Sequence, residues 1–194
     1  MITKYGIIAG PTYPSQQELD LFRSLGLGAV KLTCGAQPAT SVEAFRNVGA
    51  YVLQARIHYP AITSGRTPTQ FVDDMRGAID AYIKAGLGEF EILNEPNTTR
   101  GGFGKSWNSG DEFNKWFIEA AKRLRDAFPG IRLGFPGLSP GAADLNTDPA
   151  TGQAYRPVGD VDFLEACNDA VLSVNFLCVH AYWNNVDEMR MFET

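Results

Sequence analysis

The sequence has few cysteines, few histidines and no long hydrophobic run. Its 3 cysteines lie in or beside apolar segments without metal-ligand spacing, so we expect free buried thiols and no structural metal. No segment is long enough for a transmembrane helix. The N-terminal apolar stretch, residues 6–10, runs directly into Pro11 and Pro14. This is no secretory signal, so we expect a cytoplasmic protein by default.

The sequence also has no excess of positive charge: its formal net charge is −5. The chain therefore has no electrostatic footprint for nucleic acid or an anionic membrane, and we expect neither as a partner. Hydrophobic residues make up 44% and charged residues 20%, which is ordinary for a globular domain. A neutral, polar small molecule fits this composition better as a substrate.

Apolar runs of strand type alternate with segments of helical period along the whole chain. The predicted strands cover residues 5–9, 29–33, 51–57, 90–93, 131–135 and 174–179. Helices between them begin at the predicted capping boxes 15–18 and 40–43, at Thr67-Pro68, ahead of the stripe 113–124, and at 161; a sixth helix begins near 187. Strict alternation predicts one domain with a parallel sheet and right-handed crossovers.

The connections between these elements are unequal in length. The helix-to-strand connections are short, whereas the strand-to-helix segments 58–65, 96–110 and 136–159 are long and rich in glycine and polar residues. This inequality is typical of a (β/α)₈ TIM barrel, which builds its sites from the loops at the carboxyl ends of the strands. An open doubly wound sheet is the alternative, but no glycine-rich phosphate loop follows the first strand, which favours the barrel. We expect no cofactor.

The chain is short for a complete barrel, which typically needs about 250 residues. We therefore expect an incomplete α/β barrel over residues 1–194, with about six βα units and without strands seven and eight. Such a sheet would leave two open edges and uncover part of the barrel core. We expect the chain to self-associate through this gap or to belong to a longer polypeptide.

Polar and aromatic side chains follow three of the predicted strands. Parallel strands end at the same face of a barrel, so we expect these side chains to converge on one site. They are, in chain order, His58, Asn94, Glu95, His180, Tyr182 and Trp183.

Asn94-Glu95-Pro96 after strand four and His180-Ala181-Tyr182 after strand six resemble motifs of the clan A retaining glycoside hydrolases. This superfamily includes many cellulases, mannanases, xylanases and β-xylosidases. The resemblance implies that Glu95 is the general acid/base and that Asn94 binds the 2-hydroxyl of the sugar. It also implies cleavage of β-linked glycosidic bonds in an oligosaccharide or polysaccharide.

The same resemblance implies that His180 and Tyr182 line the reacting subsite and that His58 lies in the site. Trp183 follows this motif, and an aromatic face suits the apolar face of a sugar ring, so we expect it to stack on substrate. Trp107, in a glycine-rich loop, is an alternative stacking residue. Glu91 lies deeper than Glu95, and we expect it to have a structural role, paired within the barrel.

The sequence departs from the superfamily in two respects. An arginine often ends strand two, where this chain has Lys31 and Thr33. The nucleophilic glutamate ends strand seven, whereas Glu188 and Glu193 lie in a helix-like stretch soon after strand six. We therefore expect the nucleophile to be missing from this chain and the chain to have little activity. A catalytically inactive carbohydrate-binding barrel remnant is the alternative, and a lyase or isomerase using a lysine base is a weaker one.

Overall fold

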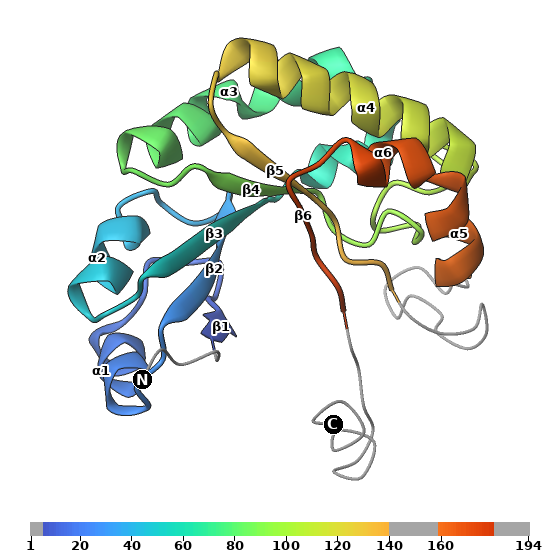
Figure 1. Cartoon of the computed structure of the whole chain (residues 1–194). Coiled ribbons are helices and arrows are strands. Elements are labelled where there is room, and N and C mark those ends of the chain that lie inside the picture. Colours follow the sequence, from blue (N-terminus) through green and yellow to red (C-terminus); the bar gives the residue numbers. More distant parts are fainter. Residues whose placement is uncertain (1–5, 140–158, 181–194) are drawn as a thin grey trace, which may run out of the picture.

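A computed structural model describes residues 6–139 and 159–180. Within them, six parallel strands form one sheet in the order β1-β2-β3-β4-β5-β6. Figure 1 shows that this sheet curls into an arch. The strands are β1 (Gly6–Ile8), β2 (Ala29–Cys34), β3 (Val52–Ile57), β4 (Glu89–Ile92), β5 (Arg132–Phe135) and β6 (Phe176–Leu177).

The helices lie on the outer side of the arch (Figure 1). They are α1 (Gln16–Ser24), α2 (Ser41–Asn47), α3 (Pro68–Lys84), α4 (Gly110–Ala127), α5 (Asp160–Ala166) and α6 (Asn168–Leu172), with a 3-10 helix, η1 (Pro60–Ser64). Parallel strands that alternate with outer helices and curl into a half-barrel form a partial (β/α)₈ barrel, so the predicted fold is confirmed. None of the helices in the described ranges is long and apolar enough to cross a membrane.

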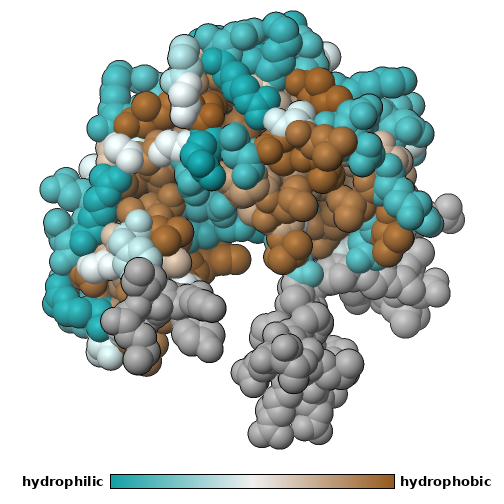
Figure 2. Space-filling model, in the orientation of Figure 1, coloured by the Kyte–Doolittle hydropathy of each residue, from teal (hydrophilic) through white to brown (hydrophobic). Residues whose placement is uncertain are grey.

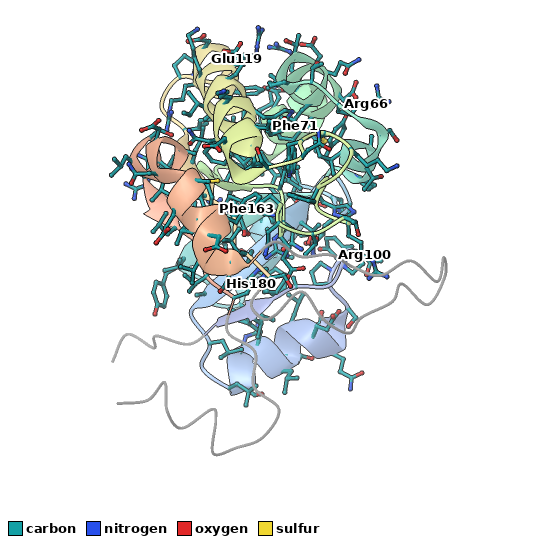
Figure 3. The ribbon with its side chains drawn as sticks, turned by 90° about the vertical axis from the view of Figure 1, so that its right-hand side faces the viewer. Arg66, Phe71, Arg100, Glu119, Phe163 and His180 are labelled. Atoms are coloured by element: carbon teal, nitrogen blue, oxygen red, sulfur yellow. The ribbon has the colours of Figure 1, made fainter. Side chains whose placement is uncertain are left out.

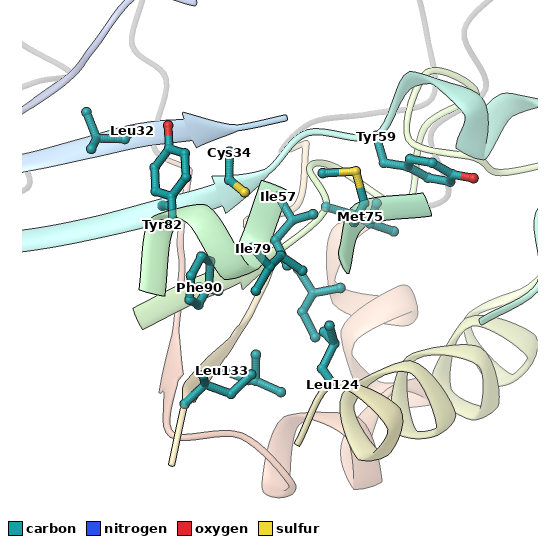
Figure 4. Close-up of a cluster of buried hydrophobic side chains, with 14 of the residues drawn as sticks. Leu32, Cys34, Ile57, Tyr59, Met75, Ile79, Tyr82, Phe90, Leu124 and Leu133 are labelled. Carbon is teal, nitrogen blue, oxygen red and sulfur yellow. The ribbon is translucent and has the colours of Figure 1, made fainter. Parts of the chain in front are cut away.

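The hydrophobic core lies between the sheet and the helices. Burial alternates along β2, where Val30, Leu32 and Cys34 are buried and Lys31 and Thr33 are only half-buried. This alternation turns every second side chain toward the helices and leaves the others on the inner face. Figure 4 shows the buried set, which includes Leu32, Ile57, Phe90 and Leu133 from the strands, Met75, Ile79 and Tyr82 from α3, and Leu124 from α4.

Two helix starts are capped by side chains. Ser15 and Glu18 form the predicted capping box of α1, and Thr67 and Gln70 form another at the start of α3. The capping box predicted at Thr40 is wrong, because Thr40 makes no side-chain cap hydrogen bond. Its backbone, at φ −60° and ψ −19°, is already helical, whereas a capping hydroxyl requires an extended residue.

The last described elements differ most from the sequence prediction. The single helix expected at 161–170 is two short helices, which meet at Cys167. The Cys167 thiol contacts the Gly110 carbonyl oxygen at 3.4 Å, and the Asn114 side chain accepts a hydrogen bond from the Ala170 amide at 2.8 Å. These contacts with α4 hold the break in place. The sixth helix predicted near 187 lies outside the described residues.

Strands β1 and β6 stand at the two ends of the arch, and each pairs with one strand among the described residues. Large apolar side chains are exposed on β1 and just after β6, including Ile8 at 62% and Val179 at 83%. Figure 2 shows a wide hydrophobic area around β6 and α5, where Leu164 and Leu177 are also exposed. Self-association through these edges stays a prediction.

Candidate active site

A strained turn follows β4 and carries the predicted acid/base. Leu93 has φ 66° and Glu95 has φ 45°, which are left-handed values that residues with a Cβ rarely adopt. The Glu95 amide donates to the Gly137 carbonyl at 3.0 Å, and the Glu95 carbonyl accepts from the Thr98 amide and hydroxyl at 3.0 and 2.8 Å. A Cβ on Gly101 would lie 2.0 Å from that same carbonyl oxygen. Close packing on both sides therefore maintains the unusual backbone.

The Glu95 carboxylate contacts a histidine from a distant strand. His180 Nδ1 lies 2.9 Å from Glu95 Oε1, and the side chains of the pair are 11% and 22% exposed. The other ring nitrogen, His180 Nε2, lies 3.0 Å from a terminal nitrogen of Arg56. The structure thus brings together two residues that are 85 positions apart in sequence, as their places at the ends of strands four and six predict.

Beneath this pair lies a buried ion cluster on the inner face of the sheet. Glu91 has no exposed surface, and its Oε2 accepts from Lys31 Nζ and Arg56 Nε, each at 2.9 Å. Its Oε1 accepts from the Gly137 amide at 3.1 Å. Burial by itself would raise the pKa of Glu91, but the charges of Arg56 and Lys31 and their hydrogen bonds hold this pKa below its ordinary value. Glu91 is therefore an ionised structural anchor, which confirms the predicted pairing within the barrel.

A cavity of about 280 Å³ opens beside Glu95. Its walls come from the segments that follow β3 and β4, and include His58, Tyr59, Asn94, Glu95 and Arg100. Glu95 is the one carboxylate among the described residues that line it. In Figure 3, His180 and Arg100 lie below α3 and α4, whereas Glu119 lies at the top of the view on α4.

The structure places four of the six predicted site residues together. Asn94, Glu95 and His58 line the cavity, and His180 contacts Glu95. Tyr182 and Trp183 lie outside the described residues.

The alternative role of Trp107 in sugar stacking is wrong. Its side chain is 1% exposed, and its ring nitrogen donates to the Pro96 carbonyl at 2.8 Å. The ring packs against Phe113 and Trp116, with centroids 4.7 and 5.3 Å away. A residue enclosed in this way cannot present a face to a sugar. Trp107 instead anchors the long loop between β4 and α4 to the core.

Sequence reasoning did not assign a role to Arg56 or Arg100. Arg56 lies on the inner face of β3, two positions before His58, so the period of a strand would have indicated an inward charge. Arg100 lies in a loop without periodicity, and no signal in the sequence points to its place at the cavity.

The described residues offer little support for a cysteine nucleophile or for a metal site. Burial raises the pKa of the Cys178 thiol to about 11, and the charge of Glu91 acts in the same direction, so its thiolate is scarce at neutral pH. No group of three or more histidine, cysteine, aspartate or glutamate side chains in residues 6–139 and 159–180 could hold a metal ion.

The sequence matches no protein-family model and no curated protein. Its structure is similar to a glucosidase from Croceicoccus marinus, with a TM-score of 0.52 and 19% identity, over 89% of this chain and 42% of that chain. It also aligns with the hydrogenase maturase HydG, at a TM-score of 0.49 and 14% identity over 92% of this chain and 41% of that chain. A β-mannanase from the blue mussel Mytilus edulis aligns at a TM-score of 0.42 and 13% identity, over 87% of this chain and 62% of that chain.

At these identities the similarity concerns the fold alone, which is a partial form of the barrel seen in the glucosidase. The chain spans less than half the length of that glucosidase.

The buried ion cluster predicts a pH-dependent stability. Because the pKa of Glu91 is lowered in the folded state, its stabilising contribution is complete above the ordinary glutamate pKa of about 4.3 and is lost as pH falls through the lower folded value. Glu91→Gln should cost about 3–5 kcal/mol of unfolding free energy at neutral pH, because it leaves Lys31 and Arg56 without their buried counter-charge.

Urea unfolding at a series of pH values measures this effect. The stability difference between wild type and Glu91→Gln should shrink below about pH 4. Glu119→Gln is the control, because Glu119 forms a half-exposed i,i+4 ion pair with Arg123 on α4, and it should change stability little at any pH. A Glu91→Gln difference that stays constant down to acid pH would contradict the interpretation.

Because the backbone of Glu95 is left-handed, we expect glycine to be more stabilising than alanine at this position, which is the reverse of their order in a helix. Glu95→Gly and Glu95→Ala both remove the carboxylate, so the difference between them reports the backbone. At φ 45°, glycine should be more stable than alanine by about 1 kcal/mol. At Lys122, exposed in the middle of α4, alanine should instead be more stable by a similar amount. Thermal or urea unfolding of the four variants checks this, and the same order at both positions would argue against strain at Glu95.

Proposed function

We propose that this protein is a glycoside hydrolase that cleaves β-linked glycosidic bonds by a retaining two-carboxylate mechanism, with Glu95 as general acid/base. The observation that carries the proposal is the position of Glu95 itself. This carboxylate follows β4, lines a cavity, contacts His180 and rests on a strained backbone. Backbone strain of this kind clusters at functional sites, and barrel enzymes build their sites at the carboxyl ends of the strands.

In this mechanism Glu95 would donate its proton to the glycosidic oxygen while the bond from that oxygen to the anomeric carbon breaks. The contact with His180 restricts the rotation of the carboxyl group, so that it meets the oxygen in one orientation. In the second step Glu95 would remove a proton from the water that releases the sugar from the enzyme.

A retaining enzyme needs a second carboxylate about 5–5.5 Å from the first, which attacks the anomeric carbon. Glu91 does not suit this role, because it is buried and three donors occupy its oxygens. We propose that the nucleophile lies in a seventh strand that is not part of these 194 residues. By itself the chain should then hydrolyse β-linked oligosaccharides very slowly.

Two features of the cavity support a polar sugar as its ligand. The side-chain oxygen of Asn94 is buried and makes no hydrogen bond to the described part of the chain, which is costly unless another group supplies a donor. A sugar hydroxyl is such a donor. His58, which is exposed, also lines the cavity, where it offers a further polar contact. Tyr182 and Trp183 are proposed to complete the substrate site.

A leaving-group series tests the role of Glu95. In an active form of the protein, Glu95→Gln should reduce turnover by several orders of magnitude on substrates whose leaving group needs protonation. The loss should be much smaller on aryl glycosides with good leaving groups, which barely need an acid in the first step. Steady-state kinetics on both substrate types measures this. Equal losses on both would remove Glu95 from the acid/base role.

A second candidate function is carbohydrate binding without turnover. The observation in its favour is that Glu95 is the one carboxylate among the described residues lining the cavity. Both candidates require the 194-residue chain to bind sugar, whereas only the enzyme requires an active longer form.

Calorimetry with a panel of β-linked oligosaccharides measures the binding. Asn94→Ala should weaken it by about tenfold, as expected for the loss of one hydrogen bond of about 1–1.5 kcal/mol. Asn47→Ala, at the exposed end of α2, is the matched control and should leave the affinity unchanged. No binding of any of these sugars, by a chain shown to be folded, would count against both candidates.

A further inference from the structure

The His180 ring is engaged at both of its nitrogens. Nδ1 lies 2.9 Å from Glu95 Oε1, and Nε2 lies 3.0 Å from a terminal nitrogen of Arg56. An arginine guanidinium has five N–H donors and no acceptor, and it keeps its charge at all ordinary pH values. The ring nitrogen that faces Arg56 must therefore accept a hydrogen bond, so it carries no proton. The proton of a neutral His180 then lies on Nδ1, from which it is donated to Glu95.

We propose that Arg56 is a positioning residue that keeps His180 as the neutral Nδ1–H tautomer and thereby as an uncharged donor to Glu95. Arg56 acts through His180 and has no contact of its own with a substrate in this scheme. The role of Glu95 as acid/base belongs to the proposed function, on which the catalytic part of this inference rests. The tautomer itself depends only on the contacts of the ring.

Arg56 is held firmly enough for this role. Its Nε donates to Glu91 at 2.9 Å, which leaves a terminal nitrogen directed at the ring. Arg56 and Glu91 are register partners on β3 and β4, and Lys31 on β2 contacts the same Glu91 oxygen. The Arg56 side chain is 16% exposed and that of Glu91 is fully buried. Three neighbouring strands therefore fix the direction of the guanidinium.

Gly137 lets the ring enter this arrangement. A Cβ at Gly137 would lie 2.4 Å from the Cδ2 atom of His180, far closer than real contacts allow. The amide of Gly137 donates to Glu91, and its carbonyl accepts from the amide of Glu95. One glycine thus connects the buried anchor, the histidine ring and the acid/base residue, and any side chain at this position would displace the ring.

The tautomer matters because an unprotonated Nε2 leaves the His180 ring without a positive charge beside Glu95. A positively charged imidazolium beside Glu95 would favour the ionised carboxylate, because an opposite charge within about 4–6 Å stabilises the charged form. An acid catalyst must instead carry a proton when the substrate arrives. A neutral histidine still orients the carboxyl group through one hydrogen bond. Arg56 supplies the reason why Nε2 carries no proton in this scheme, since such a proton would point at the guanidinium.

Nitrogen NMR of the 194-residue chain tests the tautomer without any measurement of activity. The chain has only two histidines, so a sample labelled with ¹⁵N at histidine gives two rings, and His58→Gln identifies His180 by subtraction. In buffer at neutral pH, wild-type His180 should show a protonated Nδ1 and an unprotonated Nε2. A proton on Nε2 of the wild-type protein would overturn the proposal.

Arg56→Met removes the donor and should allow a proton on His180 Nε2 under the same conditions. Arg132→Met is the matched control, because Arg132 and Glu89 form a similar pair on adjacent strands, β5 and β4, in an exposed position. The control should leave both histidine spectra unchanged. An unprotonated Nε2 in a folded Arg56→Met protein would show that Arg56 is not the cause.

Arg56→Lys covers the case in which the methionine variant does not fold. A lysine keeps a positive charge beside Glu91, but its single ammonium group cannot reproduce the two directed contacts of the guanidinium. This variant should fold and should also gain a proton on Nε2. A wild-type tautomer in Arg56→Lys would contradict the proposal.

Kinetics separates this inference from the proposed function. If the leaving-group series shows that Glu95 is not the acid/base, the NMR experiment still tests the tautomer of His180 independently. If Glu95 is the acid, Arg56→Met in an active form should reduce turnover more on substrates with poor leaving groups than on aryl glycosides. Equal losses on both, with the tautomer changed as expected, would remove only the catalytic part of the inference.

Discussion

The arrangement of the inner face depends on one buried carboxylate. Glu91 has no contact with solvent, and an isolated charge in that position would be strongly destabilising. Lys31 and Arg56 supply the compensating charges, and the Gly137 amide occupies the remaining oxygen. These four groups come from β2, β3, β4 and the segment after β5. The curl of the sheet must hold them within hydrogen-bond distance of one another, which couples the shape of the half-barrel to the position of the site above it.

The candidate site extends this cluster toward the cavity. Arg56 contacts the His180 ring and restricts its orientation, and His180 in turn contacts the Glu95 carboxyl group and restricts its orientation. The left-handed backbone at Glu95 is maintained from the other side by Thr98 and Gly101. Rigid placement of a single carboxyl group is what acid catalysis requires, because misplacement by about 1 Å costs much of the rate.

Fold and function rest on different grounds in this protein. The half-barrel is established by its own topology and by its similarity to a glucosidase, but barrels of this type host many unrelated chemistries. Glycoside hydrolysis is proposed from the site: a carboxylate beside a cavity, a histidine in contact with that carboxylate, and a buried amide oxygen that suits a hydroxyl ligand.

The sequence by itself determined the alternation of strands and helices, the inward or outward parity of their side chains, and the ends of the strands at which Glu95 and His180 lie. These features follow from the spacing of apolar and polar residues, which is a local property of the sequence. Only the tertiary structure decided that Trp107 is core, that Thr40 caps nothing and that Arg56 contacts His180. Arg56 and His180 are 124 positions apart, and no local pattern carries the distance between them. The burial of Trp107 and the backbone angles of Thr40 are three-dimensional properties that the residue types alone do not specify.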